Sequence, residues 1–409
     1  MEQARLTGGF WRFWGATFLA NIGDGIRLAA FPLLAASLTD DPLAVATVAA
    51  AQFLPWLLFG LMAGSWADRF PSRRLLVTAD ALRTVVLGVL VAGIALGWAG
   101  IALVVATAVV LGVGETVRDT AAQSTIPRLV AAPLLERANS RLVAGEIVGN
   151  EFVGPPVGAA LFAVGAALPF AANGGALALA LMLLLSVPLS AGLLTSRERP
   201  AAEVEDGVRA GLRWLAGHRL LRTLTGVGAL VAAADAAWFS IFVLFVRDRL
   251  DLGVVGFGWL LASGALGGLV GSWAAERLLV RRGAVTRHRE VLAGSIVVTA
   301  GVPVLLVAVP ELWAAVAVTV ITSGGFALFN VAALSLRHRS VPEGLVGRVT
   351  AAGRVVTLSS AGVGTLLGGW LAGAIDLATP FLFSGVLAVV ALAWWWTASR
   401  PAGPAPSAA

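Results

Sequence analysis

The stretch Gly64-Ser65-Trp66-Ala67-Asp68-Arg69 recurs, with one residue added, as Gly271-Ser272-Trp273-Ala274-Ala275-Glu276-Arg277. Each copy closes a long apolar segment and opens a short loop that is rich in arginine. The two copies lie about half the chain apart, and an internal duplication of this kind is typical of membrane proteins built from two similar halves. The sequence therefore predicts a duplicated helical membrane protein.

The composition supports this prediction. Hydrophobic residues make up 58% of the 409 residues and charged residues only 13%, whereas a soluble protein carries about 25% charge. At about 20 residues for each span, we predict an all-α membrane protein with twelve transmembrane helices in two pseudo-symmetric six-helix halves. The spans are predicted at 13–38, 43–66, 75–97, 99–122, 140–164, 168–194, 220–246, 254–278, 290–309, 311–336, 349–375 and 377–399.

The distribution of arginine predicts the orientation of these spans. Loops 67–74, 123–141, 195–222, 277–289 and 337–348, together with the termini, hold nearly all arginines outside the spans, whereas the opposite loops hold only Arg247 and Arg249. Basic residues concentrate on the cytoplasmic side of a bilayer. We therefore expect a multi-pass protein of a bacterial inner membrane with both termini in the cytoplasm. The net charge of +6 is explained by these loops, so no nucleic-acid partner is expected.

The longest polar loop divides the chain. We predict an N-terminal half at 1–194, a cytoplasmic linker at 195–219, a C-terminal half at 220–400 and a disordered tail at 401–409. Apolar and arginine side chains alternate in the second part of the linker with the spacing of an amphipathic helix, which is typical of a segment in the headgroup layer. A plain tether between the halves is the alternative.

Several reactive site types are excluded by residue usage. The chain has no cysteine, so disulfides and thiolate metal sites are absent. The three histidines, His218, His288 and His338, fall in predicted loops and do not cluster, so no metal site is expected. No phosphate-binding G-x-x-x-x-G-K-[ST] loop occurs. We expect no cofactor and no catalytic residue, and the chain is not expected to be an enzyme.

The first copy of the repeat continues into Phe70-Pro71-Ser72-Arg73-Arg74, and the whole resembles the loop signature of the major facilitator superfamily. The runs Ile126-Pro127-Arg128, Leu135-Glu136-Arg137 and Gly154-Pro155-Pro156 follow in order. Together with Val341-Pro342-Glu343-Gly344 in the second half, they resemble the bacterial branch that holds the enterobactin exporter and macrolide efflux proteins.

This resemblance implies a conformational latch on the cytoplasmic side. A carboxylate at the end of a helix can meet the positive end of a neighbouring helix dipole, and the arginines can pair with acids at nearby helix ends. The alternative for Arg73 and Arg74 is anchoring to lipid phosphates. The predicted latch residues are Gly64, Asp68, Arg69, Arg73, Arg74, Asp119, Glu276 and Arg277.

The fifth span carries a motif that resembles an exporter signature. Gly154, Pro155 and Gly158 match it, whereas Ala159 replaces the final glycine. Glycines allow close approach of helices and proline bends them. Ordinary helix packing is the alternative role of the same residues.

Charged residues inside the spans are the main candidates for a site, because an ion in hydrocarbon is expensive. Asp24 and Asp235 lie deep in the first and seventh spans. Arg27 follows Asp24 by one turn, so the two can also form a purely structural pair. In the third span we expect a structural pair of Asp80 with Arg83, and in the fourth a pair of Glu115 with Arg118.

The resemblance also implies that spans one, four, seven and ten line a central cavity. The predicted substrate and proton cavity comprises Asp24, Arg27, Trp56, Glu115, Glu146, Asp235, Trp238, Phe239, Asn330 and Arg354. Aromatic faces with a few acids suit cationic amphiphiles. Because of Arg27 and Arg354, an anionic siderophore is the alternative substrate.

These features predict a monomeric secondary transporter that exports a hydrophobic or amphipathic small molecule by proton antiport and alternating access. With every histidine in a loop, carboxyl groups would carry the proton. An importer of a small solute with the same fold is the first alternative. A non-transporting sensor or a membrane enzyme is the second, and no nucleophile–base set supports it.

Overall fold

The computed structural model describes residues 6–187, 213–280, 285–341 and 345–399. These residues are helical apart from short connections, and none of those described lies in a strand. Within them, 11 helices are long and apolar enough to cross a membrane, and a shorter apolar segment covers Pro42–Phe53. The predicted all-α membrane fold is therefore confirmed, and twelve spans are compatible with it.

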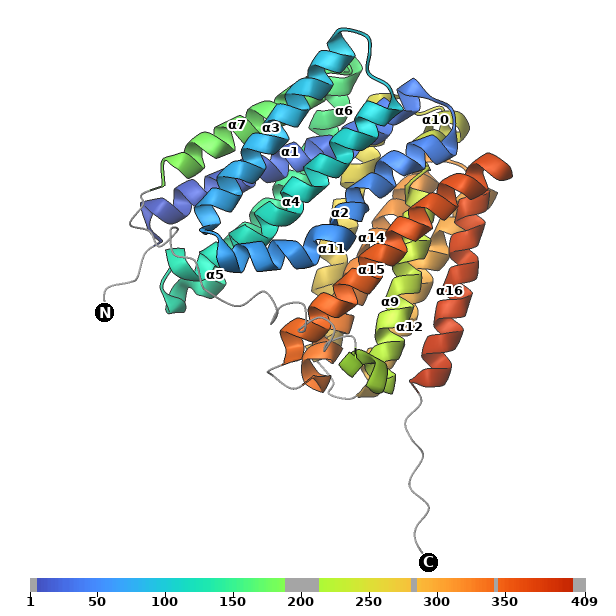
Figure 1. The fold of residues 1–409 in the computed structure, drawn as a ribbon. Helices are drawn as coiled ribbons and strands as arrows, with labels where there is room; N and C mark the ends of the chain where they lie inside the picture. The colour runs from blue at the N-terminus through green and yellow to red at the C-terminus, as the bar shows by residue number, and fades with distance from the viewer. Residues whose placement is uncertain (1–5, 188–212, 281–284, 342–344, 400–409) are drawn as a thin grey trace, which may run out of the picture.

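The helices form two groups. Figure 1 shows the N-terminal group in blue to green and the C-terminal group in yellow-green to red. The N-terminal bundle contains α1 (Gly8–Leu38), α2 (Pro42–Arg69), α3 (Ser72–Ala95), α4 (Ile101–Leu129), α5 (Leu135–Glu146), α6 (Gly154–Val164) and α7 (Leu168–Leu185). The C-terminal bundle contains α9 (Arg219–Phe239), α10 (Phe242–Leu250), α11 (Val254–Val280), α12 (Val285–Ile296), α13 (Leu305–Ala308), α14 (Leu312–Ser340), α15 (Val346–Ala374) and α16 (Thr379–Ala398). The predicted linker, 195–219, and tail, 401–409, lie largely or wholly outside the described residues, and the exact division of the chain stays a prediction.

Three predicted spans are interrupted. A turn of π-helix, Ile147–Val153, joins α5 to α6, and another, Val297–Gly301, follows α12. A proline stands two residues after the end of each turn, Pro155 and Pro303, and proline removes a backbone hydrogen bond from a helix. Between α9 and α10, the Ser240 hydroxyl donates to the carbonyl oxygen of Ala237 and also lies 3.3 Å from that of Thr365. A hydroxyl that takes up backbone acceptors in this way offsets the break.

The surface of both bundles is apolar. Side chains such as Val164, Trp98 and Trp313 are 80%, 55% and 68% exposed, which would be unfavourable in water over so large an area. In a hydrocarbon environment the exposure of apolar side chains has no such cost, and each helix forms hydrogen bonds between its own backbone N–H and C=O groups. The outer surface is therefore suited to a bilayer.

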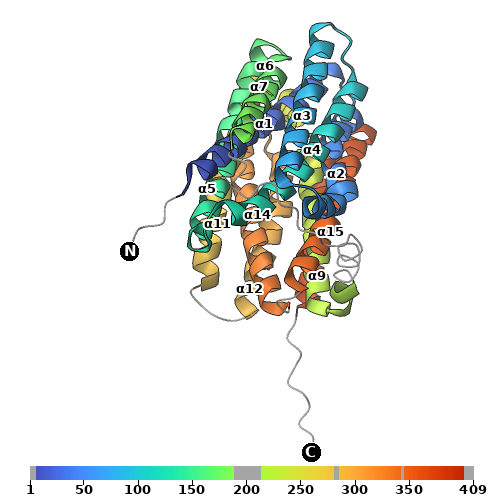
Figure 2. The same ribbon diagram turned by 60° about the vertical axis from the view of Figure 1, so that its left-hand side comes forward.

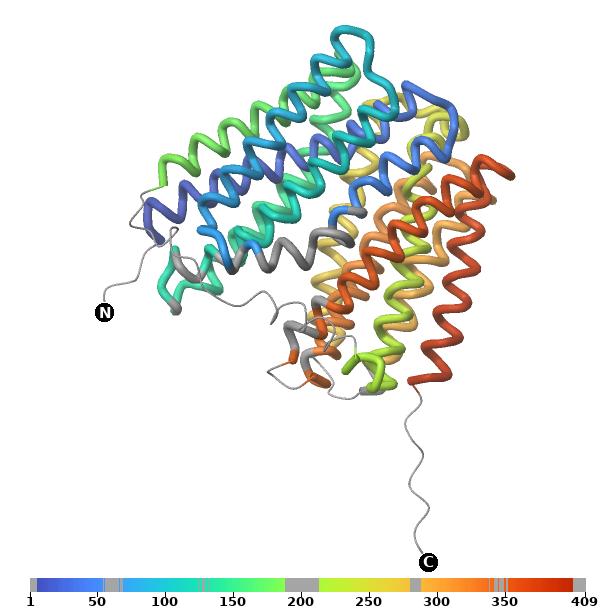
Figure 3. Tube along the Cα trace, viewed as in Figure 1, coloured from blue at the N-terminus to red at the C-terminus, as the bar shows by residue number. Residues whose placement is uncertain are grey.

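The bundles meet through two pairs of helices, α2 with α15 and α6 with α11. On the side of the α1–α2 connection, Arg247 of α10 donates to the carbonyl oxygen of Ala36 at 3.0 Å and to Asp40 at 2.9 Å. Figure 3 shows α10 beside this connection. Figures 1 and 2 show the start of α1 and the end of α16 on the opposite side of the molecule.

Candidate functional site

A network of buried charges fills the middle of the N-terminal bundle. Its carboxyl groups belong to Asp24, Asp80, Glu115 and Asp119, and its guanidinium groups to Arg27, Arg83 and Arg118. These residues come from α1, α3 and α4 only. Arg83 and Asp80 are fully buried, so their charges depend on one another rather than on water.

Each arginine of this network has a principal carboxylate partner on another helix. Arg83 donates to Asp24, Arg27 contacts Glu115 at 2.5 Å, and Arg118 contacts Asp80 at 2.8 Å. The expected pair of Glu115 with Arg118 is therefore wrong, because α1 supplies Arg27 to Glu115 while α3 supplies Asp80 to Arg118. Within its own helix, Arg27 lies 3.4 Å from Asp24.

Asp119 is the carboxyl group left over from this pairing. In the described part of the chain it forms no ion pair and no hydrogen bond, although Glu115, Arg118, Asp24 and Arg83 act on it electrostatically. The network thus contains one carboxyl group more than it has guanidinium groups.

Sequence reasoning treated Asp80, Arg83 and Arg118 as structural residues outside the candidate site. Their charge within the third and fourth predicted spans was the available signal. Spacing within one helix hid the interhelical partners, since Asp80 and Arg83 are 3.9 Å apart and each lies nearer to a charge on another helix.

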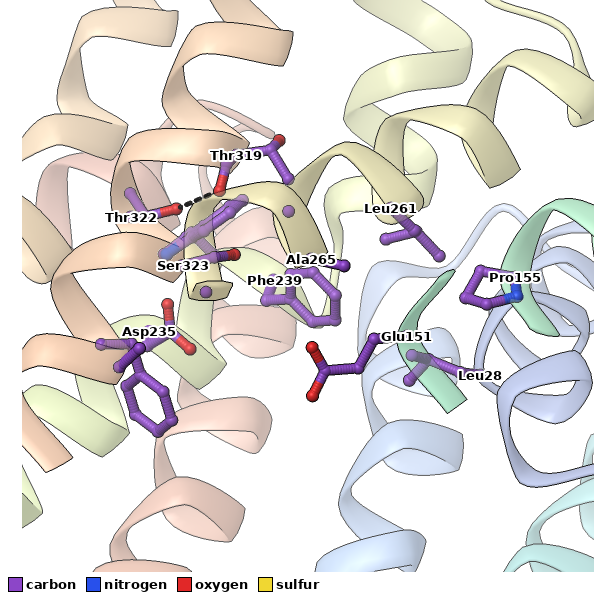
Figure 4. Close-up of a pocket in the computed structure, with 15 residues that line it drawn as sticks. Leu28, Glu151, Pro155, Asp235, Phe239, Leu261, Ala265, Thr319, Thr322 and Ser323 are labelled. Carbon is purple, nitrogen blue, oxygen red and sulfur yellow. Dashed lines mark hydrogen bonds between the residues drawn. The ribbon is translucent and has the colours of Figure 1, made fainter. Parts of the chain in front are cut away.

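A separate cavity of about 290 Å³ lies between the bundles. The N-terminal bundle contributes Leu28, Glu151 and Pro155; the C-terminal bundle contributes Asp235, Trp238, Phe239 and residues of α11 and α14, among them Thr319, Thr322 and Ser323. Figure 4 shows the Glu151 carboxyl group extending into the cavity from the side of Pro155, with Asp235 on the opposite side. We name it the acidic cavity.

Aromatic rings form one wall of the acidic cavity. Trp238 is 1% exposed and packs edge-on against Phe239 and Phe242, with ring centroids 5.6 Å and 5.1 Å apart. Phe239 and Phe326 keep 37% and 38% of their surface exposed, so a bound molecule can reach both rings. The predicted residues Asp235, Trp238 and Phe239 are thus brought together, whereas Asp24, Arg27 and Glu115 gather in the charge network.

A second cavity, of about 520 Å³, lies within the C-terminal bundle between α9, α14 and α15. It contains Asn330 and Arg354 from the predicted set, and Arg337 in addition. Glu146, at the end of α5, is exposed and acts electrostatically on Arg354. Trp56 lies outside the residues whose side chains the structure describes.

The predicted latch residues that the structure describes form contacts other than the expected ion pairs. Arg73 donates to the carbonyl oxygen of Leu185 at 2.7 Å, and Arg277 stacks on Trp273 of its own helix at 4.0 Å. Arg69, Arg74 and Glu276 are exposed, and no ion pair joins the latch residues that the structure describes. Gly64 and Asp68 lie outside the residues whose side-chain surroundings are described.

The Gly-Pro motif lies where α6 contacts α1. A Cβ atom on Gly154 would come 2.4 Å from the Cα atom of Gly25, and one on Gly158 would come 2.3 Å from the carbonyl oxygen of Ile26. Both positions therefore require glycine for this approach of the helices. On its other side, Pro155 lies beside Gly258 of α11.

Comparison with known proteins gives a family and a fold. A family model described as Major Facilitator Superfamily matches residues 13–364. The multidrug efflux pump Tap of Mycobacterium tuberculosis is 30% identical over 91% of each chain, and Tap of Mycolicibacterium fortuitum is 27% identical over 91% of this chain and 93% of its own.

Solved structures share the fold at lower identity. A bacterial homologue of the iron transporter ferroportin, in an inward-facing state, superposes with a TM-score of 0.77 at 19% identity, covering 96% of this chain and 99% of its own. The nucleoside transporter NupG gives 0.78 at 12% identity over 96% and 100% of the two chains.

Proposed function

Because this chain belongs to the major facilitator superfamily, we propose that it exports a hydrophobic or amphipathic small molecule from a bacterial cell. The observation that carries the proposal is the acidic cavity between the bundles, where Glu151 and Asp235 face a space walled by aromatic and apolar side chains. Such a cavity suits an amphiphile with a positive group. The likeness to Tap supports outward transport.

Protons are the proposed coupling ion. Asp235 lies deep in α9 with no cation acting on it among the described residues, and isolated membrane carboxyls typically belong to proton relays. Asp24, which was expected to carry a proton, is ion-paired with Arg83, whereas Asp119, which was expected in the latch, forms no ion pair with the described residues. We therefore place the proton of the C-terminal bundle on Asp235, and Asp119 joins Asp24 as the candidate in the N-terminal bundle.

Alternating access is supported by the contacts between the bundles. Arg247 links them on the side of the α1–α2 connection, while on the opposite side no ion pair joins the latch residues that the structure describes. This is the arrangement expected when the cavity opens towards the cytoplasm. The Asp68 latch would then form in the outward-open state, in a protein that works as a monomer in the bilayer.

Transport in proteoliposomes with an imposed pH gradient tests this function. We expect gradient-driven movement of a cationic dye, with a macrolide and a siderophore as further probes. Glu151→Gln and Asp235→Asn should each reduce it, whereas Glu136→Gln, an exposed acid away from the cavity, should not. Uptake of a small solute in the opposite direction would favour the importer, and dye flux that ignores the gradient would contradict proton coupling.

The orientation is tested by labelling. The chain has no native cysteine, so Gly97→Cys and Ser399→Cys supply single reporters at opposite ends of the helices. We expect a membrane-impermeant maleimide to label Gly97→Cys from outside the cell and Ser399→Cys only after the membrane is opened. Labelling of both from outside would contradict cytoplasmic termini.

A further inference from the structure

The cavity between α9, α14 and α15 has the opposite electrostatic character to the acidic cavity. Its lining includes Arg337 and Arg354, together with Thr225 and Thr350, and contains no carboxyl group among the described residues. Its volume of about 520 Å³ lies in the range of small-molecule sites. Phe326 lines both cavities, so they are neighbours.

Arg337 is the central residue of this second cavity. Its side chain is half-buried, its Nε atom is buried without a hydrogen-bond partner, and no carboxylate of the described chain forms an ion pair with it. A guanidinium group withdrawn from water without a counter-ion is unfavourable. An anion bound beside it would remove that cost.

The guanidinium group lies against Gly353 of α15. A Cβ atom at this position would lie 3.1 Å from Nη2 and 3.4 Å from Cζ of Arg337. The absence of a side chain at Gly353 therefore lets the planar group lie against the helix backbone. Arg354 follows immediately in sequence and adds a second positive charge to the same wall.

Neutral donors and apolar walls complete the cavity. The hydroxyl groups of Thr225 and Thr350 are buried and have no hydrogen-bond partner among the described residues, so each can donate to an anion. Leu224, Phe326 and Phe329 supply apolar surface for the rest of a ligand. The combination of charged donors, hydroxyls and aromatic surface fits an amphiphile with an anionic head.

We propose that this cavity binds the carboxylate or phosphate group of an anionic amphiphile, with Arg337 as its main ligand. The group can belong to a small soluble molecule or to a lipid. This site is distinct from the acidic cavity, and its occupancy does not depend on transport or on proton coupling.

Calorimetric titration of the protein in phosphatidylcholine nanodiscs tests the site, with 1-naphthoate as the probe and 1-naphthamide as its neutral counterpart. We expect 1-naphthoate to bind the parent protein more tightly than 1-naphthamide. Arg337→Gln should weaken 1-naphthoate binding about tenfold or more, which corresponds to about 1.4 kcal/mol. Arg339→Gln is the matched control, because Arg339 is exposed on the same helix and does not line the cavity.

A second set of nanodiscs, containing phosphatidylglycerol, distinguishes the two sources of the anion. If phosphatidylglycerol displaces 1-naphthoate in the parent protein, the lipid headgroup occupies the site; if it does not, the ligand is a soluble anion. Equal binding of the acid and the amide, equal binding by the parent and Arg337→Gln, or no binding in phosphatidylcholine would each overturn the proposal. The comparison of acid with amide needs no variant, so it holds even if Arg337→Gln does not fold.

Discussion

The two bundles differ in the kind of polar side chains that they contain in their interiors. The N-terminal bundle joins seven ionisable side chains on three helices into one network, five of them buried and Glu115 and Asp119 partly exposed, and each arginine of the network pairs with a carboxylate. In the described C-terminal bundle, Asp235 is the only carboxyl group deep within the helices, and the buried polar residues are mainly hydroxyls. These include Thr299, Thr319, Thr322, Thr365 and Ser384.

This difference indicates that the two halves of a duplicated fold can have different roles. Paired charges fix the positions of α1, α3 and α4, because moving one helix would leave a buried charge alone. Hydroxyl groups such as those of Thr319 and Thr322 bond to carbonyls of their own helix, each at 2.8 Å, and impose no partner on a neighbour. The C-terminal bundle therefore leaves room for the cavity between α9, α14 and α15 and supplies most of the lining of the acidic cavity, whereas the N-terminal bundle is held together by its paired charges.

The largest expected effect comes from breaking the network. Arg83→Leu should lower the free energy of unfolding by about 3–5 kcal/mol, since it leaves Asp24 with only the more distant Arg27. Chemical denaturation in detergent micelles measures this change. Arg74→Leu, an exposed arginine on the same helix, is the control and should change stability by less than about 1 kcal/mol. A loss no larger for Arg83→Leu than for Arg74→Leu would show that the network does not hold the bundle.

A matched pair of carboxyl variants sharpens the comparison. Asp24→Asn should destabilise the protein by about 3 kcal/mol because Arg83 loses its partner. Asp235→Asn should leave stability within about 1 kcal/mol, because no ion pair is broken, yet abolish gradient-driven flux. Melting temperature and flux are measured on the same preparations. Full flux in Asp235→Asn would remove it as a proton carrier, and unchanged melting in Asp24→Asn would contradict the structural role.

The sequence was sufficient for the helical membrane fold, because few folds besides a bundle of membrane helices combine apolar segments of about 20 residues with arginine-rich loops on one side. The interruptions of the spans were harder to predict. The π-turn before Gly154 depends on how close α6 comes to Gly25, and nothing in a single segment states that distance.

The candidate site was also predicted only where its residues lie close together in the sequence. Asp235, Trp238 and Phe239 were found because they are close in sequence on one helix. The partners of Arg83 and Arg118 lie on helices that a single sequence cannot place beside one another. Arg337 was missed because its position near a loop fits the ordinary excess of arginine in the cytoplasm, whereas its burial against Gly353 is a tertiary feature.

A smaller effect is expected at the contact between the bundles. Arg247→Ala removes the bonds to Ala36 and Asp40. Because the side chains are largely exposed, the contact should be worth less than about 1 kcal/mol, which is a shift of about fivefold at most in the populations of two states. A cysteine reporter, Gly253→Cys, should react faster with an external maleimide when Arg247→Ala is added to it. Arg249→Ala in the same background is the control and should leave the labelling rate unchanged. Asp40→Ala should add little to Arg247→Ala if the two act as one contact, and an unchanged labelling rate would contradict an outer closure.

A local effect, also of about 1 kcal/mol at most, is expected at the corresponding last helices of the two bundles. Asp376 accepts hydrogen bonds from the backbone amides of Ala378 and Thr379, at 3.0 Å and 2.9 Å, and from the Thr379 hydroxyl at 2.7 Å. The N-cap residues of α7 and α16 are both alanines without a side-chain cap, Ala167 and Ala378, and at α16 Asp376 supplies the acceptor instead. Replacing a capping residue with alanine costs about 1 kcal/mol, so Asp376→Ala should lower the melting temperature slightly.

The same residue predicts a dependence on pH. The hydrogen bonds from Thr379 lower the pKa of Asp376 below its ordinary value, so the folded protein favours the carboxylate. Its contribution to stability is therefore complete above the unfolded pKa of about 4 and is lost as the pH falls through the lowered folded value. The difference in melting temperature between the parent and Asp376→Ala should then be constant at neutral pH and should shrink in acid. A difference that grew as the pH fell would mean that the protonated group is the better cap, and α16 would owe nothing to this charge.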